Sequence, residues 1–138
     1  EVGAMLAVPT GGAAAGCGAY LLVLYRAEEA HFTLTIVDTG LGLEHHPCRT
    51  DPRTGLLQRS LGVVVPKVPR ERLADSGFWF LLYRQMYAAK PSTSPAEAAA
   101  QVYGTLLPAL NDQPLMAAVN ATTLRWRAPP LGADLTHA

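Results

Sequence analysis

Two adjacent stretches near the N-terminus show the clearest pattern of apolar and polar positions. Between residues 31 and 38, Phe32, Leu34 and Ile36 alternate with Thr33, Thr35 and Val37, the period of two that is typical of a half-buried strand. Residues 20–25 form an unbroken apolar run, which favours a strand buried on both faces. The short charged segment 26–30 between them predicts a hairpin connection.

Weaker signals predict further strands on either side of this hairpin. Residues 4–8 are apolar and stop at Pro9, which predicts a short edge strand, and residues 39–55 show turn chemistry throughout. Residues 56–65 resume the strand pattern, and Pro66 is expected to end that strand or place it at an edge. Residues 115–119 predict a short helix or strand, and residues 122–126 are weakly strand-like.

The second half of the chain changes to a helical period. Asp75 and Ser76 can cap a helix through about residue 89. Ser94 and Glu97 form a capping box around Pro95, which predicts a second helix to about residue 110 with Pro108 distorting its last turn. Strands followed by helices predict an α+β fold, a small antiparallel sheet (hairpin plus edge strands) followed by a packed helical pair, in a single domain over residues 1–128. Residues 129–138 are expected to be a linker or a loosely ordered tail.

These patterns also predict which side chains are buried. The first helix should bury a face made by Phe78, Leu81, Leu82 and Met86. The predicted core consists of Leu21, Val23, Phe32, Leu34, Ile36, Val64, Phe78, Leu82, Val102 and Leu106.

Composition narrows the possible functions. The 138 residues are 49% hydrophobic and 16% charged, with a formal net charge of zero, so the overall field favours neither nucleic acid nor an anionic membrane. No apolar run approaches the roughly 20 residues of a membrane-spanning helix. The glycine-rich segment 9–18 lacks the Gly-Lys-Ser/Thr of a phosphate loop, and no cofactor is expected. The start has neither an initiator Met nor a signal peptide, which predicts a piece of a longer chain or a processed product.

The two cysteines, Cys17 and Cys48, are expected to be free thiols. Free thiols favour the cytoplasm or another reducing intracellular compartment.

The order of strands, glycine loop and hairpin resembles the carboxyl half of papain-like cysteine peptidases. The resemblance covers roughly residues 5–40 and depends on Cys17-Gly18-Ala19-Tyr20 at the start of one strand and Asp38-Thr39-Gly40 at the end of the next. In that family the first strand presents a histidine base and the second an Asn or Asp that orients it. Here Gly18 occupies the histidine position, so the resemblance implies a papain-like fold that has lost its catalysis. Asp38-Thr39-Gly40 also fits a simple strand exit, in which Asp bonds the following backbone.

Two chemical alternatives use neighbouring residues. Cys17 could be the nucleophile of a peptidase- or thioesterase-type cysteine hydrolase, with His45 or His46 as base and Asp38 as orienting residue, if residues 19–30 were a helix that lowered the pKa of the thiol. His45, His46, Cys48 and Asp51 lie within seven residues and could bind zinc, although Pro47 would turn adjacent ligands apart.

The aromatic residues favour a role in protein contacts. Aromatic and Arg side chains are enriched at protein interfaces, and here they are Trp79, Tyr83, Arg84, Tyr87 and Trp126. We therefore expect a non-catalytic interaction or structural module whose partners are other protein subunits or the remainder of a longer chain.

Overall fold

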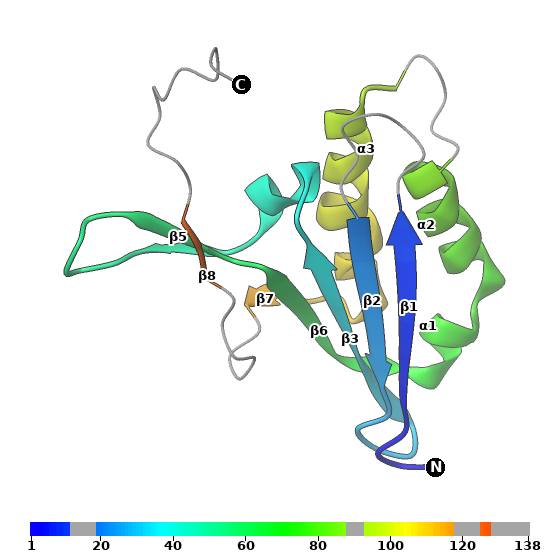
Figure 1. Ribbon diagram of the computed structural model, residues 1–138. Helices are drawn as coiled ribbons and strands as arrows, with labels where there is room; N and C mark the ends of the chain where they lie inside the picture. The colour runs from blue at the N-terminus through cyan, green and yellow to red at the C-terminus, as the bar shows by residue number, and fades with distance from the viewer. Residues whose placement is uncertain (12–18, 88–92, 118–124, 128–138) are drawn as a thin grey trace.

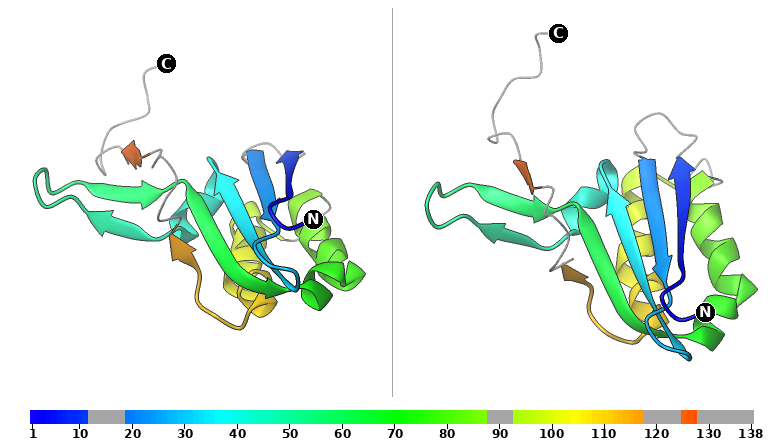
Figure 2. Two further views of the ribbon diagram at one scale, coloured as in Figure 1. Left: turned by 90° about the horizontal axis from the view of Figure 1, so that it is seen from below. Right: turned by 60° about the horizontal axis from the view of Figure 1, so that its bottom comes forward.

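The computed structural model describes residues 1–11, 19–87, 93–117 and 125–127. Its main element is a five-stranded sheet, in the order β1-β2-β3-β6-β7, in which all neighbours are antiparallel. Three helices lie on one side of this sheet, and no helix of the described residues covers the other side, which we call the open side (Figures 1 and 2). The α+β class with a small antiparallel sheet followed by helices is therefore confirmed. The strands are β1 (Met5–Gly11), β2 (Ala19–Tyr25), β3 (His31–Asp38), β6 (Gly62–Pro69) and β7 (Met116–Ala117), and the helices are α1 (Arg70–Ala74), α2 (Ser76–Tyr87) and α3 (Pro95–Gln101).

A second, three-stranded sheet extends away from the helical layer (Figure 2). It consists of β4 (Cys48–Thr50), β5 (Leu57–Ser60) and β8 (Arg125–Arg127), in the order β4-β5-β8. The short 3₁₀ helix η1 (Leu41–His45) connects β3 to β4. Residues 39–55, which show turn chemistry throughout their sequence, therefore also contain the short elements η1 and β4.

The predicted hairpin is confirmed as β2 and β3, with Tyr20 opposite Asp38. The expectation that residues 20–25 are buried on both faces was wrong: Leu22 is 2% exposed, whereas Leu21 is 37% exposed. Helices cover only one face of the sheet, so side chains alternate between the core and the open side as in a half-buried strand. An apolar run cannot reveal this difference, since both of its faces are apolar.

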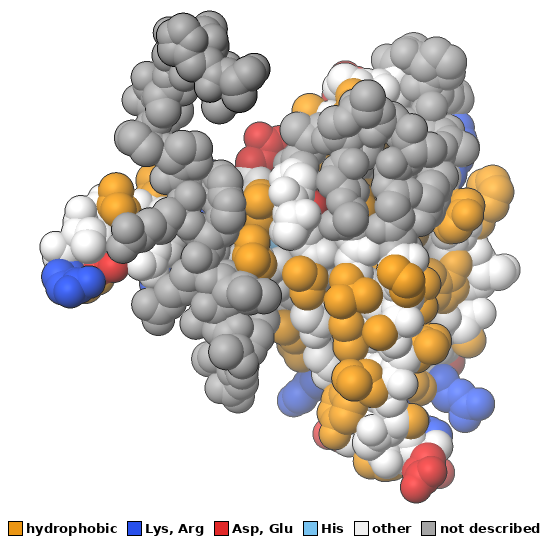
Figure 3. All heavy atoms as spheres, in the orientation of Figure 1, with side chains coloured by type: hydrophobic (Ala, Val, Ile, Leu, Met, Phe, Trp, Pro, Cys, Tyr) orange, Lys and Arg blue, Asp and Glu red, His pale blue; other side chains and the backbone are white. Residues whose placement is uncertain are grey.

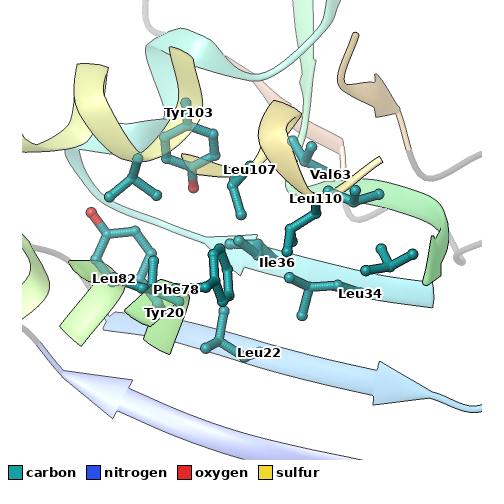
Figure 4. Close-up of a cluster of buried hydrophobic side chains, with 13 residues drawn as sticks. Tyr20, Leu22, Leu34, Ile36, Val63, Phe78, Leu82, Tyr103, Leu107 and Leu110 are labelled. Atoms are coloured by element: carbon teal, nitrogen blue, oxygen red, sulfur yellow. The ribbon is translucent and has the colours of Figure 1, made fainter. Parts of the chain in front are cut away.

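The core lies between the inner face of the sheet and the helices (Figure 4). The predicted core residues that are buried are Leu34, Ile36, Phe78, Leu82 and Val102. The predicted core residues that are not fully buried are Leu21, Val23, Phe32, Val64 and Leu106. In β2 and β6 the error is one of register, because Leu22, Val63 and Val65 occupy the inner face instead.

Pro66 does not end its strand. The expected strand over residues 56–65 is two strands, β5 and β6, which separate at Leu61, and β6 continues through Pro66. A shift in the pairing with β3 occurs between Phe32 and Leu34, and Lys67 takes a positive φ of 52° at this bulge. Because β7 pairs only with Val63 and Val64, it does not require an N–H from residue 66.

Both helix starts agree with the sequence. Helix α2 begins at Ser76, and Asp75 Oδ1 accepts a hydrogen bond from Gly77 N. Leu81 is exposed, so its assignment to the buried face was wrong. The preceding helix α1 was not expected, and residues 88–92 lie outside the described part of the chain.

Helix α3 has the predicted capping box, in which Ser94 and Glu97 bond one another through side chain and backbone. It continues into the π turn η2 (Val102–Leu106) and the 3₁₀ turn η3 (Pro108–Leu110). Leu107 N donates to Val102 O, five residues back. Proline has no N–H and its ring crowds the carbonyl four residues earlier, so Pro108 explains why the regular helix does not continue, as predicted.

No helix among the described residues is long and apolar enough to cross a bilayer.

Candidate functional site

A chain of three buried polar side chains lies where β3 meets the helical layer. Asp38, at the end of β3, is fully buried, and its Oδ1 accepts a hydrogen bond of 2.6 Å from Gly40 N. Its other oxygen, Oδ2, lies 3.0 Å from the hydroxyl of Tyr103, a buried residue of the π turn η2. The bond to Gly40 agrees with the strand-exit interpretation of this motif, whereas the contact with Tyr103 goes beyond it.

His46 is the third member of the chain. Its Nδ1 lies 2.7 Å from the carbonyl oxygen of Ser60, and its Nε2 lies 3.0 Å from the Tyr103 hydroxyl. Because a carbonyl oxygen can only accept, Nδ1 carries a hydrogen and donates it to Ser60. The Tyr103 hydroxyl therefore bridges His46 and Asp38, both of which are almost completely buried.

Burial shifts the titration of two members of this chain. Loss of hydration is the largest cause that lowers the pKa of His46 below 6.5, and the hydrogen bond to Ser60 and the charge of Asp38 oppose it. Loss of hydration also raises the pKa of Tyr103 far above its ordinary value, with the Asp38 carboxylate as the second cause. The Tyr103 hydroxyl consequently keeps its hydrogen at any physiological pH.

The backbone of η1 closes over this chain at Gly42. A Cβ built on Gly42 would overlap Asp38 Oδ2 and the ring of Tyr103. Only glycine therefore lets the backbone approach the carboxylate so closely. The Gly-Leu-Gly pattern after β3 is thus explained, at Gly42, by packing onto the buried acid.

Arg59 of β5 holds η1 from the other side. Its Nη1 lies 3.1 Å from Leu43 O, 2.7 Å from Glu44 O and 3.4 Å from His46 O. These carbonyls belong to the end of a short 3₁₀ helix and the residues that follow it, where backbone acceptors otherwise lack partners. One guanidinium therefore links the second sheet to the segment that carries His46.

His45 is placed differently from His46. Its ring stacks on Tyr103, with the ring centroids 5.5 Å apart and an interplanar angle of 12°. Its Nε2 lies 3.3 Å from Glu44 Oε1 but is not aligned for a hydrogen bond with it. His45 thus covers one face of the Tyr103 ring, and the Glu44 carboxylate lies beside it.

This arrangement bears directly on the cysteine-hydrolase alternative. Both ring nitrogens of His46 are engaged, with Ser60 and Tyr103, and both oxygens of Asp38 have partners. Cys17 and Gly18 lie outside the described residues. Residues 19–25 form strand β2, which pairs antiparallel with β3, instead of the helix that a low-pKa thiol at residue 17 would need.

The four residues of the zinc alternative are not brought together. Cys48 is an exposed free thiol, and Asp51 accepts hydrogen bonds from Arg53 N and Gln58 Nε2, while His46 faces Ser60 and Tyr103. Over the described ranges, no three His, Cys, Asp or Glu side chains are grouped so that they could hold a metal ion.

The aromatic residues predicted for interaction have different environments. Trp79 is half-buried and donates from Nε1 to Leu73 O at 2.7 Å, so it fastens α2 to α1. Tyr83 is exposed on α2 and Arg84 is half-buried beside it. Tyr87 lies in α2 and Trp126 in β8, where the structure describes the backbone alone.

The open face of the main sheet is a second candidate surface. Met5 lies opposite Tyr25, and Leu21 lies opposite Val37. Met5 is 70% exposed and Tyr25 is 43% exposed. The space-filling view shows hydrophobic side chains gathered over β1, β2 and β3 (Figure 3). Where the described residues of β1, β2, β3 and β6 pair with one another between Met5 and Val64, most side chains of this face are apolar or threonine: Met5, Ala7, Pro9, Leu21, Val23, Tyr25, Thr33, Thr35, Val37, Gly62 and Val64. His31, at the start of β3, lies on the same face, and its Nδ1 is 3.3 Å from Glu28 Oε2.

Sequence reasoning found Asp38 and His46 but missed their link, Tyr103. The helical spacing of residues 99–110 places Tyr103 on the buried stripe, and this was the available signal, because a buried tyrosine hydroxyl needs a polar partner. Comparisons with family models, with curated proteins and with solved structures found no match to this chain.

Proposed function

We propose that this chain is a non-catalytic interaction module, a degenerate relative of the papain-like fold, that packs the open face of its main sheet against another protein surface. The partner is another subunit or the remainder of a longer chain, and its contacting side chains are apolar. The observation that carries the proposal is the continuous run of apolar and threonine side chains across the described open-face positions of β1, β2, β3 and β6, with His31 only at its margin.

A largely apolar open face is unusual for a sheet that helices cover on one side only. Antiparallel sheets normally present polar residues to water, and large exposed apolar patches mark interaction surfaces. Leu21, Tyr25 and Met5 remain exposed to solvent in the folded domain, so their apolar character does not contribute to the packing of its core. A protein partner explains it, because burial against an apolar surface stabilises the complex by roughly 25 cal/mol per Å² removed from water.

The buried chain supports the non-catalytic part of the proposal. An orienting residue in a papain-like site accepts a hydrogen bond from the histidine base. Here the two Asp38 oxygens are already engaged, with Gly40 N and the Tyr103 hydroxyl. These contacts, together with those of both His46 ring nitrogens, give Asp38 and His46 a structural role at this end of the sheet.

The surface is tested by changing its charge. The double variant Leu21→Lys/Tyr25→Lys should remain folded, since both side chains are exposed, and should reduce the binding of an apolar fluorescent dye and the concentration-dependent self-association seen in sedimentation. The matched control is Phe80→Lys/Tyr83→Lys on α2, which introduces the same charge in place of exposed aromatic residues elsewhere. A wild-type chain that neither binds the dye nor self-associates, or a control that behaves as the sheet variant does, would contradict the proposal.

A separate measurement addresses catalysis. In a Cys48→Ser background, Cys17 should react with iodoacetamide at the rate of an ordinary thiol, and peptide and thioester substrates should not turn over. Rapid labelling of Cys17 near neutral pH, together with hydrolysis that Cys17→Ser abolishes, would instead establish the cysteine hydrolase.

A further inference from the structure

The contacts in the buried chain require more hydrogens than its side chains ordinarily supply. The Nδ1 hydrogen of His46 is used by Ser60 O. The Tyr103 hydroxyl has one hydrogen but lies 3.0 Å from both His46 Nε2 and Asp38 Oδ2. If His46 is neutral and Asp38 is ionised, one of these two contacts joins two acceptors with no hydrogen between them, an arrangement that is costly for buried groups.

One additional proton completes the chain. It can lie on Nε2 of His46, which then donates to Tyr103, or on the carboxyl of Asp38, which then donates to Tyr103. Both arrangements place a hydrogen in every contact and give the three side chains no net charge. Without this proton the three side chains together carry one uncompensated buried charge.

We propose that Asp38, Tyr103 and His46 form a buried proton-binding site that holds one proton, shared between the carboxyl and the imidazole, at neutral pH. Because the two groups are coupled through Tyr103, this proton is lost in a single step that belongs to the chain as a whole. When it leaves, one 3.0 Å contact opens, and the attachment of η1 to the helical layer weakens.

The charged and titratable groups around the site influence which of the two side chains, Asp38 or His46, binds this proton. His45 of η1 and Arg59 of β5 disfavour a cationic His46, while Asp38 favours it. Tyr20 of β2 faces Tyr103, and Glu44 lies beside His45.

The variant Asp38→Asn separates this proposal from a simple Tyr–Asp hydrogen bond. An asparagine amide can donate to the Tyr103 hydroxyl, which then donates to a neutral His46, while its oxygen still accepts from Gly40 N. The variant thus completes the same chain without an additional proton. Its folded state has no proton to lose above pH 6.5, which is the ordinary pKa of histidine.

The test is urea unfolding of the wild type and of Asp38→Asn between pH 5 and 9. Above about pH 6.5 the folded wild type retains a proton that the unfolded wild type does not bind. The equilibrium constant for unfolding of the wild type should therefore rise by up to about tenfold per pH unit. Asp38→Asn should show no such rise and should be the more stable protein at pH 8. It should lose stability only as pH falls through about 6.5, because the lowered pKa of His46 keeps the folded imidazole neutral while the unfolded one takes up a proton.

The other titratable groups contribute equally to both proteins. The difference between the two pH profiles therefore measures the proton bound by Asp38, Tyr103 and His46. The proposal is overturned if the two profiles are parallel, or if Asp38→Asn is the less stable protein at pH 8. Should Asp38→Asn fail to fold, the wild-type profile still decides, since a wild type that is independent of pH between 6.5 and 8.5 has no shared proton. Tyr103→Phe, which breaks both contacts, should also abolish the rise above pH 6.5.

Discussion

Gly42 of η1 lies directly against Asp38, so that the smallest possible side chain at residue 42 would overlap Oδ2 of the carboxylate. The same Cβ would meet the ring of Tyr103. This contact sets how closely the segment after β3 approaches the helical layer, and it keeps the carboxylate away from water. The position of one glycine is therefore coupled to the integrity of the buried chain.

Gly42→Ala should strongly destabilise the protein. Asp38 and Tyr103 are both buried and hydrogen-bonded, so neither can move aside without losing a partner. We expect a loss of about 1–3 kcal/mol or more in the free energy of unfolding, the range for inserting a methyl group into a packed site. Gly104→Ala is the matched control, because a Cβ there meets nothing within 4 Å and should leave stability equal or raise it. Equal effects of the two substitutions in urea unfolding would show that η1 does not pack as described.

Truncation of the core should distinguish the two faces of the sheet. Leu34→Ala and Leu82→Ala each remove a fully buried side chain and should cost about 2–5 kcal/mol. Leu21→Ala removes a side chain of the same size from the open face and should cost less than about 1 kcal/mol. Thermal unfolding of the three variants measures the contrast, which would vanish if the open face were covered within this domain.

The hairpin could be predicted because its pattern is local. The alternation through Phe32, Leu34 and Ile36 is visible in the sequence, and two of these three residues are buried. The buried face of β2 could not be predicted, since Leu21 and Leu22 are chemically identical and only the placement of the helices decides between them. A β-bulge beside Phe32 likewise depends on the partner strand.

The candidate site could be predicted only in part. Asp38 and His46 stand out as polar residues beside apolar strands, whereas their connection to Tyr103 spans 65 and 57 residues of sequence. Contacts at such separations depend on how helices pack on the sheet, and one sequence carries no direct record of that. The π turn at Tyr103 adds to the difficulty, because Pro108 shifts the helical phase there.

The N-terminus of α3 should lose its capping in acid. The hydrogen bond from Ser94 N is the largest cause that lowers the pKa of Glu97 below 4.5. A lowered carboxylate pKa stabilises the folded state above pH 4.5, and this contribution is lost as pH falls through the lowered value. Glu97→Gln keeps an acceptor without a charge and should remove this acid dependence, which hydrogen exchange of the α3 amides would detect. Ser94→Ala should cost about 1 kcal/mol at neutral pH as well.

Loss of Arg59 should release η1 while the main sheet stays intact. Its Nη1 contacts the carbonyls of Leu43, Glu44 and His46, and hydrogen bonds to a charged donor each stabilise a fold by about 1.5–3 kcal/mol when they are well buried. Because Arg59 is only half-buried, we expect Arg59→Ala to cost about 1–3 kcal/mol in total. Hydrogen exchange should be faster at the amides of Leu43 and His46, which close the turns of η1, and unchanged in β2 and β3.

Arg59→Lys tests whether the charge alone is sufficient. In Arg59 one nitrogen, Nη1, makes all three contacts, and a lysine ammonium also donates from a single nitrogen. Because the ammonium is more strongly hydrated and its stem is flexible, it should recover only part of the lost stability. Arg49→Ala is the control, since it removes an exposed arginine from the adjacent strand of the same sheet. If Arg49→Ala accelerates exchange in η1 as strongly as Arg59→Ala does, the effect comes from the charge of the second sheet, and the contacts of Arg59 with η1 are not what holds His46 in the buried chain.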